Sequence, residues 1–171
     1  ITPTKYGRIV GACTDSTNIG RIATFVASQA AITSQKRQQA ICATLASSGT
    51  AVTLATTVNN ARVQIAWHYN SLVPACMVAA QVAAARVIGD SITGVINALP
   101  GEGTDPDANL TGVQLATIPM QFSVDDQPTD TEVESALNNG LVPITASTAR
   151  AGYGVLCMSI TSLSLVNGLQ N

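Results

Sequence analysis

The residues of this chain with the clearest chemical potential are one histidine, one aspartate and the many serines. His68 is the only histidine, so any mechanism with histidine as the general base must use it. It follows a predicted strand, where α/β enzymes often place catalytic groups, and Asp15 also follows a strand. The order Asp15, His68 and a later serine therefore suggests a serine hydrolase with these two residues.

The serine is the weak member of this set. The chain has neither a G-x-S-x-G turn nor another glycine-rich nucleophile turn, and Ser91, Ser135 and Ser147 each lack an adjacent glycine. A strand-end histidine that is hydrogen-bonded to backbone is the simpler interpretation of His68. We therefore predict no catalytic residues and keep the hydrolase with Asp15 and His68 as the alternative function.

Acidic and glycine-rich stretches favour neither a metal site nor a nucleotide site. The carboxylates between residues 125 and 134 lack the regular oxygen ligands around a glycine that a calcium loop needs. Helix capping and a solvated acidic face account for most of them: Asp125, Asp126, Asp130, Glu132 and Glu134. The loop 101–105 has no G-x-G-x-x-G motif, and no Walker lysine follows its glycines. We predict no metal ion and no cofactor.

The four cysteines stand apart in the sequence, each among small or apolar neighbours: Cys13, Cys42, Cys76 and Cys157. The absence of a C-x-x-C pair and the single histidine argue against a zinc site. We predict buried free thiols in a reducing compartment, although the sequence leaves a disulfide open.

The composition is that of one domain with an unusually neutral surface. A chain of 171 residues with 46% hydrophobic residues can bury a sizeable core. Charged residues make up only 11%, against roughly 25% in an ordinary domain. Such a surface suits contact with other protein, or is merely rich in Thr and Ala, and the sequence leaves both open.

Charge and hydropathy also limit the classes of partner. The net charge is −2 and no run of Lys or Arg occurs, so we predict no nucleic-acid partner and no membrane partner. The longest apolar run, residues 72–89, is interrupted by Gln81 and Arg86, and it is too short and too polar for a transmembrane helix.

The first half of the chain alternates strands with helices. The expected order is strand 6–12, helix 19–30, strand 40–46, helix 51–58, strand 63–67 and helix 74–88. Asp15 or Ser16 caps the first helix, Thr50 caps the second, and Asn59 and Asn60 end the second. Alternation of this kind predicts an α/β layered domain with a mainly parallel sheet flanked by helices.

The second half is less regular. Residues 95–99 could form a strand, and residues 110–122 are either an edge strand or an extended segment. A short helix follows, with a capping box of Thr129 with Glu132 or of Thr131 with Glu134, and Gly140 stops it. Strands at 141–146 and 153–160 would then close the sheet as an antiparallel pair near the C-terminus.

The order of elements in residues 96–150 resembles the core of contractile tail sheath proteins of bacteriophages and phage-like injection machines. The matching pieces are the turn Leu99-Pro100-Gly101, a loop, the helix through Leu137, the stop at Asn139-Gly140 and the strand that follows. Residues 5–70 are similar to the first half of that core in a generic way.

This resemblance implies a subtilisin-like sheath core without protease activity, which accounts for the order of Asp15 and His68. The implied function is that of a structural subunit that polymerises helically around an inner tube and drives contraction for injection. The implied partners are other sheath subunits and the inner tail tube protein. The implied location is the virion tail, after assembly in the bacterial host cytoplasm.

The expected domain organisation is a single sheath-core domain over residues 1–171. Because the chain starts at Ile1 without Met, we expect a fragment of a longer chain. Neither the terminal arms nor the C-terminal assembly domain of the family is recognisable, so we expect the fragment alone to be monomeric.

Overall fold

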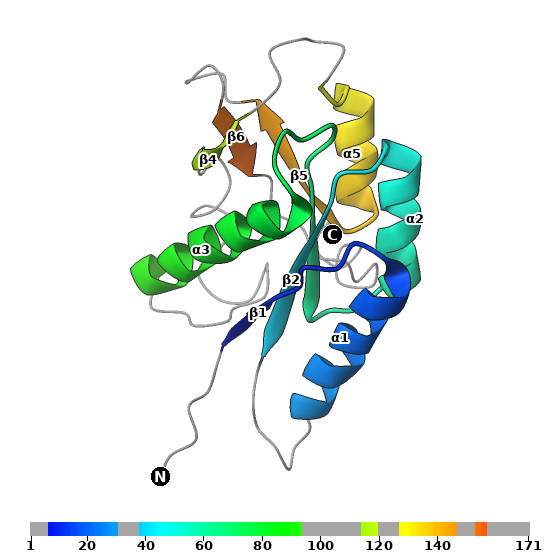
Figure 1. Cartoon of the computed structure of the whole chain (residues 1–171), viewed down its shortest axis with the longest axis vertical. Coiled ribbons are helices and arrows are strands. Elements are labelled where there is room, and N and C mark those ends of the chain that lie inside the picture. Colours follow the sequence, from blue (N-terminus) through cyan, green and yellow to red (C-terminus); the bar gives the residue numbers. More distant parts are fainter. Residues whose placement is uncertain (1–6, 31–37, 94–113, 120–126, 147–152, 157–171) are drawn as a thin grey trace.

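The computed structural model describes residues 7–30, 38–93, 114–119, 127–146 and 153–156. The elements are β1 (Arg8–Val10), α1 (Ser16–Gln29), β2 (Gln39–Thr44), α2 (Ser48–Val58), β3 (Val63–Trp67), α3 (Ala75–Thr93), β4 (Gln114–Pro119), α5 (Asp130–Asn138), β5 (Leu141–Ala146) and β6 (Tyr153–Leu156) (Figure 1). The predicted strand at 95–99 and the turn at 99–101 lie outside the described residues.

One sheet connects all the described strands, in the order β1-β2-β3-β5-β6-β4. The first four of these are mutually parallel, and β6 runs antiparallel to both β5 and β4. The structure thus confirms the predicted α/β class, with a parallel sheet flanked by helices. The ambiguous segment 110–122 contains an edge strand, β4.

Helices cover both faces of the parallel part of the sheet. Figure 1 shows α3 on one side and α1, α2 and α5 on the other. The side chains of β2 divide accordingly: Ile41 and Ala43 pack with α3, whereas Ala40 and Cys42 pack with α1 and α2. Because successive residues of a strand point to opposite faces, a strand buried on both faces needs a nearly continuous apolar sequence. All residues of β2 and β3 are indeed buried.

Two helix ends lie where the sequence predicts them, and two others differ from the prediction. Asp15 caps α1 and Asn59, at φ 33°, ends α2, both as predicted. The N-cap of α2 is Ser47 and not Thr50, because β2 already ends at Thr44 and the helix starts earlier. Helix α3 continues to Thr93 instead of ending near residue 88. A glycine inside a helix costs only about 1 kcal/mol, so Gly89 does not stop it.

The short helix α5 has the predicted capping box. Glu132 N–H donates to Thr129 Oγ1 at 3.3 Å, and Thr129 N–H donates to Glu132 Oε2 at 2.9 Å. Gly140, at φ 82°, lies between α5 and β5, in the left-handed region that glycine adopts without strain. This places β5 beside β3, where Leu141 to Ile144 are buried.

We expect Thr129→Ala to lower the free energy of unfolding by about 1 kcal/mol, because it removes the side-chain acceptor of the box. Thr131→Ala is the matched control, since Thr131 is exposed in the same helix turn. Urea denaturation of both variants measures the difference. Equal effects of the two substitutions would contradict the capping role.

Two buried glutamines in the sheet offer a second stability test. Gln39, 3% exposed, accepts a hydrogen bond from Arg8 Nη1, whereas the buried Nε2 of Gln64, 4% exposed, has no hydrogen-bond partner. A buried polar group without a partner costs about 1–3 kcal/mol. We therefore expect Gln64→Met to raise the free energy of unfolding by about 1 kcal/mol, and Gln39→Met to lower it. Chemical denaturation of the two variants measures both changes in the free energy of unfolding. A loss of stability in Gln64→Met would refute the first expectation.

Candidate functional site

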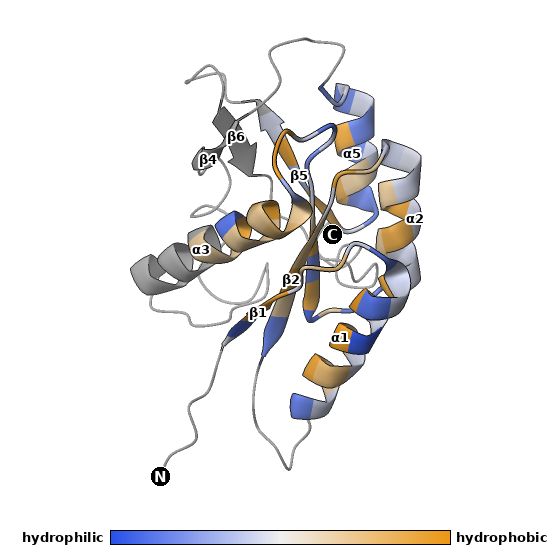
Figure 2. Cartoon of the chain, in the orientation of Figure 1, coloured by the Kyte–Doolittle hydropathy of each residue, from blue (hydrophilic) through white to orange (hydrophobic). Residues whose placement is uncertain are grey.

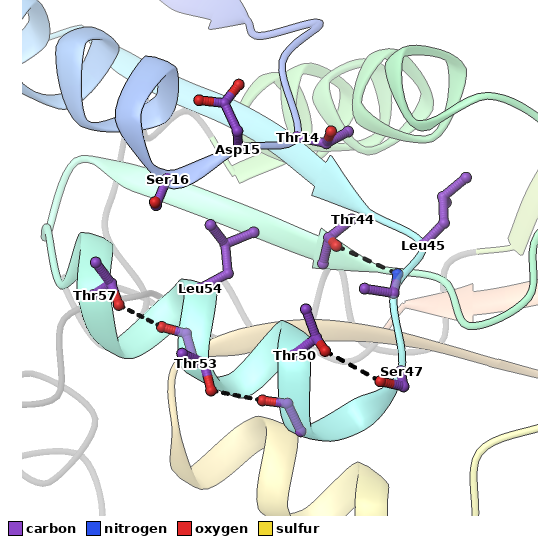
Figure 3. Close-up of a pocket in the computed structure, with 12 residues that line it drawn as sticks. Thr14, Asp15, Ser16, Thr44, Leu45, Ser47, Thr50, Thr53, Leu54 and Thr57 are labelled. Carbon is purple, nitrogen blue, oxygen red and sulfur yellow. Dashed lines mark hydrogen bonds between the residues drawn. The ribbon is translucent and has the colours of Figure 1, made fainter.

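A hollow in the described surface lies at the carboxyl ends of β1 and β2. It has a volume of about 890 Å³ and is lined by the segment 14–16, the segment 44–47 and one side of α2 (Figure 3). In open α/β sheets, ligands bind in the crevice outside the carboxyl ends of the strands. The hollow is therefore where a ligand would be sought in this fold.

Several of the hydroxyl groups that line the hollow are engaged with neighbouring groups. Thr53 Oγ1 donates to the carbonyl of Gly49 at 2.8 Å, and Thr57 Oγ1 donates to the carbonyl of Thr53 at 2.7 Å. The hydroxyls of Ser47 and Thr50 are 3.2 Å apart and hydrogen-bonded (Figure 3). Apart from the Asp15 carboxylate, the hollow thus presents mainly methyl groups and hydrogen-bonded hydroxyls.

Asp15 is the only carboxylate in the lining, and helix capping occupies it. Its Oδ1 accepts from the backbone N–H of Asn18 and its Oδ2 from Asn18 Nδ2, both at 2.9 Å. These bonds, the backbone one first, hold the pKa of Asp15 below its ordinary value. The carboxylate therefore stays ionised, as suits the positive end of a helix dipole.

His68 lies at the end of β3 and is only 1% exposed. Its backbone N–H donates to the carbonyl of Thr44 at 3.1 Å. Burial lowers the pKa of His68 to about 4, so the imidazole is neutral at pH 7. His68 does not line the hollow whereas Asp15 does, so the structure does not bring the two together there.

The serines considered with these residues are widely distributed. Ser91 belongs to the far part of α3 and Ser135 to α5, while Ser147 lies outside the described residues. A general base must come within about 3 Å of the proton that it removes. His68 is buried and is not part of the lining, so the structure does not place it beside a substrate in the hollow.

The cysteines depart from the sequence prediction in two ways. Cys42 is buried and Cys13 is half-buried against the same core, but Cys76 is exposed, so the prediction of a buried thiol was wrong for Cys76. The reason is that Cys76 lies on the solvent side of α3, whose Ala75 and Val78 face the sheet. All three thiols are free, as predicted, and Cys157 lies outside the described residues.

The second departure is that Cys13 and Cys42 are neighbours in space, which sequence reasoning missed. A signal existed, because Cys13 follows β1 and Cys42 lies within β2, the strand that pairs with it. The alignment of the two strands was the missing information.

The described residues give no sign of a metal or membrane site. They contain no group of three or more His, Cys, Asp or Glu side chains placed to hold a metal ion. No helix in this part of the chain is long and apolar enough to cross a membrane. Of the acidic residues considered above, Glu132 serves the capping box, and Asp125 and Asp126 lie outside the described ranges.

Comparison of the sequence with protein-family models and with curated proteins finds no match.

The buried neutral His68 makes stability depend on pH. Its pKa is about 4 in the folded chain, against an ordinary value of 6.5, so the unfolded chain binds more protons between these pH values. Stability is therefore expected to fall as the pH falls from about 6.5 to about 4, by about 3 kcal/mol. Denaturation midpoints across this range measure the slope. His68→Asn should reduce it, and an unchanged slope in that variant would show that other groups cause it.

Proposed function

We propose that this chain is the core of a structural subunit of a contractile tail sheath. In this proposal many copies polymerise helically around an inner tube and drive contraction for injection. The observation that carries the proposal is the segment 129–146. It forms a capped helix, a glycine stop and a buried strand beside β3, in the order that the sheath resemblance implies.

The proposal includes a subtilisin-like arrangement of the core, closed by antiparallel strands near the C-terminus. It is supported by the alternation of β1, α1, β2, α2 and β3, with helices on both faces of the parallel strands. The antiparallel ladder between β5 and β6 supports the second feature. In a sheath core of this kind the order of Asp15 and His68 would be inherited without catalysis.

The neutral surface supports a role in protein contacts. Helix α1 carries one charged side chain, Arg21, and α2 carries none. Figure 2 shows no strongly hydrophilic residue along α2. The hydroxyls of Thr53, Thr56 and Thr57 donate to carbonyls of α2 itself, so a partner could cover this face without leaving them unsatisfied. The proposed partners are other sheath subunits and the inner tail tube protein, and the proposed location is the virion tail after assembly in the host cytoplasm.

The packing also suggests where the free energy of contraction would lie. Strands β2 and β3 are buried on both faces, and a close-packed core of this kind deforms little. Contraction in the proposed sheath would therefore move whole cores relative to one another. The stored free energy would lie in the contacts between subunits, which can switch between two packed arrangements.

The test is assembly of the complete chain, including any sequence that flanks these residues in its gene. The protein is expressed with its inner tube protein, and negative-stain electron microscopy should show hollow helical tubes or sheath-like polymers. A complete chain that stays monomeric and never assembles on the tube would refute the proposal.

A variant separates this proposal from the hydrolase alternative. His68→Asn should assemble like the parent chain, since His68 is buried and has no chemical role in a sheath. The hydrolase hypothesis predicts instead that a serine-directed fluorophosphonate labels the parent chain and not His68→Asn. Thermal denaturation of the variant must first show that it is folded, and His68→Gln provides a second variant if it is not. Labelling that depends on His68 would favour the hydrolase.

A further inference from the structure

Cys13 and Cys42 pack in the same apolar cluster, on the side of the sheet covered by α1 and α2. Cys13 lies in the connection between β1 and α1, and Cys42 lies in β2. The side chain of Cys13 lies near enough to Cys42 to help raise the pKa of the Cys42 thiol. Both belong to the apolar cluster formed with α1 and α2, Cys42 as a fully buried member and Cys13 packed against it.

Gly11 provides the space for the Cys42 side chain. Its N–H donates to the carbonyl of Ile41 at 2.8 Å, which continues the ladder of β1 and β2 and brings Gly11 beside Cys42. A Cβ on Gly11 would lie 2.5 Å from Cys42 Sγ and 3.1 Å from Ile22 Cδ1. The Cys42 sulfur therefore occupies the position that a side chain at residue 11 would fill, and Cys13 follows two residues later.

The two thiols differ in their access to solvent. Cys42 is 0% exposed, whereas Cys13 is half-buried, so a dissolved reagent can reach only Cys13 directly. Burial, together with the neighbouring Cys13, raises the pKa of Cys42 to about 12. Because the thiolate is the nucleophile, the buried and protonated Cys42 is unreactive toward solution reagents. It can react only with a mixed disulfide that has formed on the neighbouring Cys13.

We propose that Cys13 and Cys42 are an oxidisable dithiol that a small-molecule disulfide, such as oxidised glutathione, closes to an intrachain disulfide. The Cys13 thiolate attacks the glutathione disulfide, whose S–S bond breaks and releases one glutathione thiol. Cys42 then attacks the Cys13 sulfur, the mixed S–S bond breaks, and the Cys42 proton passes to the departing glutathione thiolate, which leaves as the second glutathione thiol. Two cysteine thiols are oxidised and one glutathione disulfide is reduced to two thiols.

The disulfide would fix one wall of the hollow at the carboxyl ends of β1 and β2. Cys13 directly precedes Thr14, Asp15 and Ser16, which line the hollow and begin α1. A Cys13–Cys42 bond would tie this connection covalently to β2. This inference goes beyond the proposed sheath function and does not depend on it, because it rests on core residues alone.

The experiment uses the chain with Cys76→Ser and Cys157→Ser, so that only the pair remains. Folded protein is incubated with oxidised glutathione, the free thiols are counted, and peptides are mapped by mass spectrometry. The expected result is loss of both thiols, a mass lower by two hydrogens, and a cross-linked peptide that joins residues 13 and 42. A glutathione adduct that persists on Cys13, or a reaction that occurs only in denaturant, would overturn the proposal.

Three variants of this background serve as controls. Cys13→Ser should abolish the loss of the Cys42 thiol, because the buried sulfur then has no activated neighbour. Cys42→Ala should stop the reaction at the glutathione adduct of Cys13. Gly11→Ala should slow closure relative to the parent, because the added methyl displaces Cys42 Sγ. Circular dichroism shows whether each variant is folded, and the proposal fails if folded Cys13→Ser still loses the Cys42 thiol.

Discussion

A parallel sheet must be covered on both faces, and the arrangement of this molecule depends on that requirement. Strands β2 and β3 are interior strands of the sheet, and their successive side chains belong alternately to two separate hydrophobic cores. One core needs α3, and the other needs α1, α2 and α5, so both helical layers follow from the alternation within two short strands. The connections at the carboxyl ends of β1 and β2 then surround the hollow, because each must leave the sheet to begin a helix. The hollow therefore forms because the helices that cover the sheet begin beside the ends of its strands.

The sequence was sufficient for those features that depend on neighbouring residues. The apolar runs of β2 and β3, the Asp15 cap and the Gly140 stop are local signals, and the structure confirms each of them. The errors arose where tertiary packing decides between local options. Thr50 was predicted as the cap of α2, but β2 ends at Thr44 and the helix begins at Ser48, after Ser47, whose side chain makes no capping hydrogen bond. Gly89 is a weak stop signal, and the helix continues past it.

The candidate site was harder to predict, because chain order shows which edge of the sheet a residue occupies but not where its side chain points. Asp15 and His68 both follow strands, which favoured a shared site. In the fold Asp15 caps an exposed helix end, while His68 is enclosed at the end of β3. To predict that Cys13 and Cys42 lie near each other, one needs the register of β1 and β2 and the absence of a side chain at Gly11. Neither is readable without knowing that β1 and β2 are neighbours.

The same outer layer that closes the core sets what the molecule can contact. Helices α1 and α2 expose few charges, so contacts on this face would not rely on ion pairs, which salt screens and which contribute little at a surface. Shape and apolar contact would have to provide specificity there, and both require a surface whose form is fixed. Double-sided packing of the sheet supplies that rigidity. In the proposed sheath, this combination of a rigid core and a neutral face would allow neighbouring subunits to exchange one packed arrangement for another without breaking strong charge pairs.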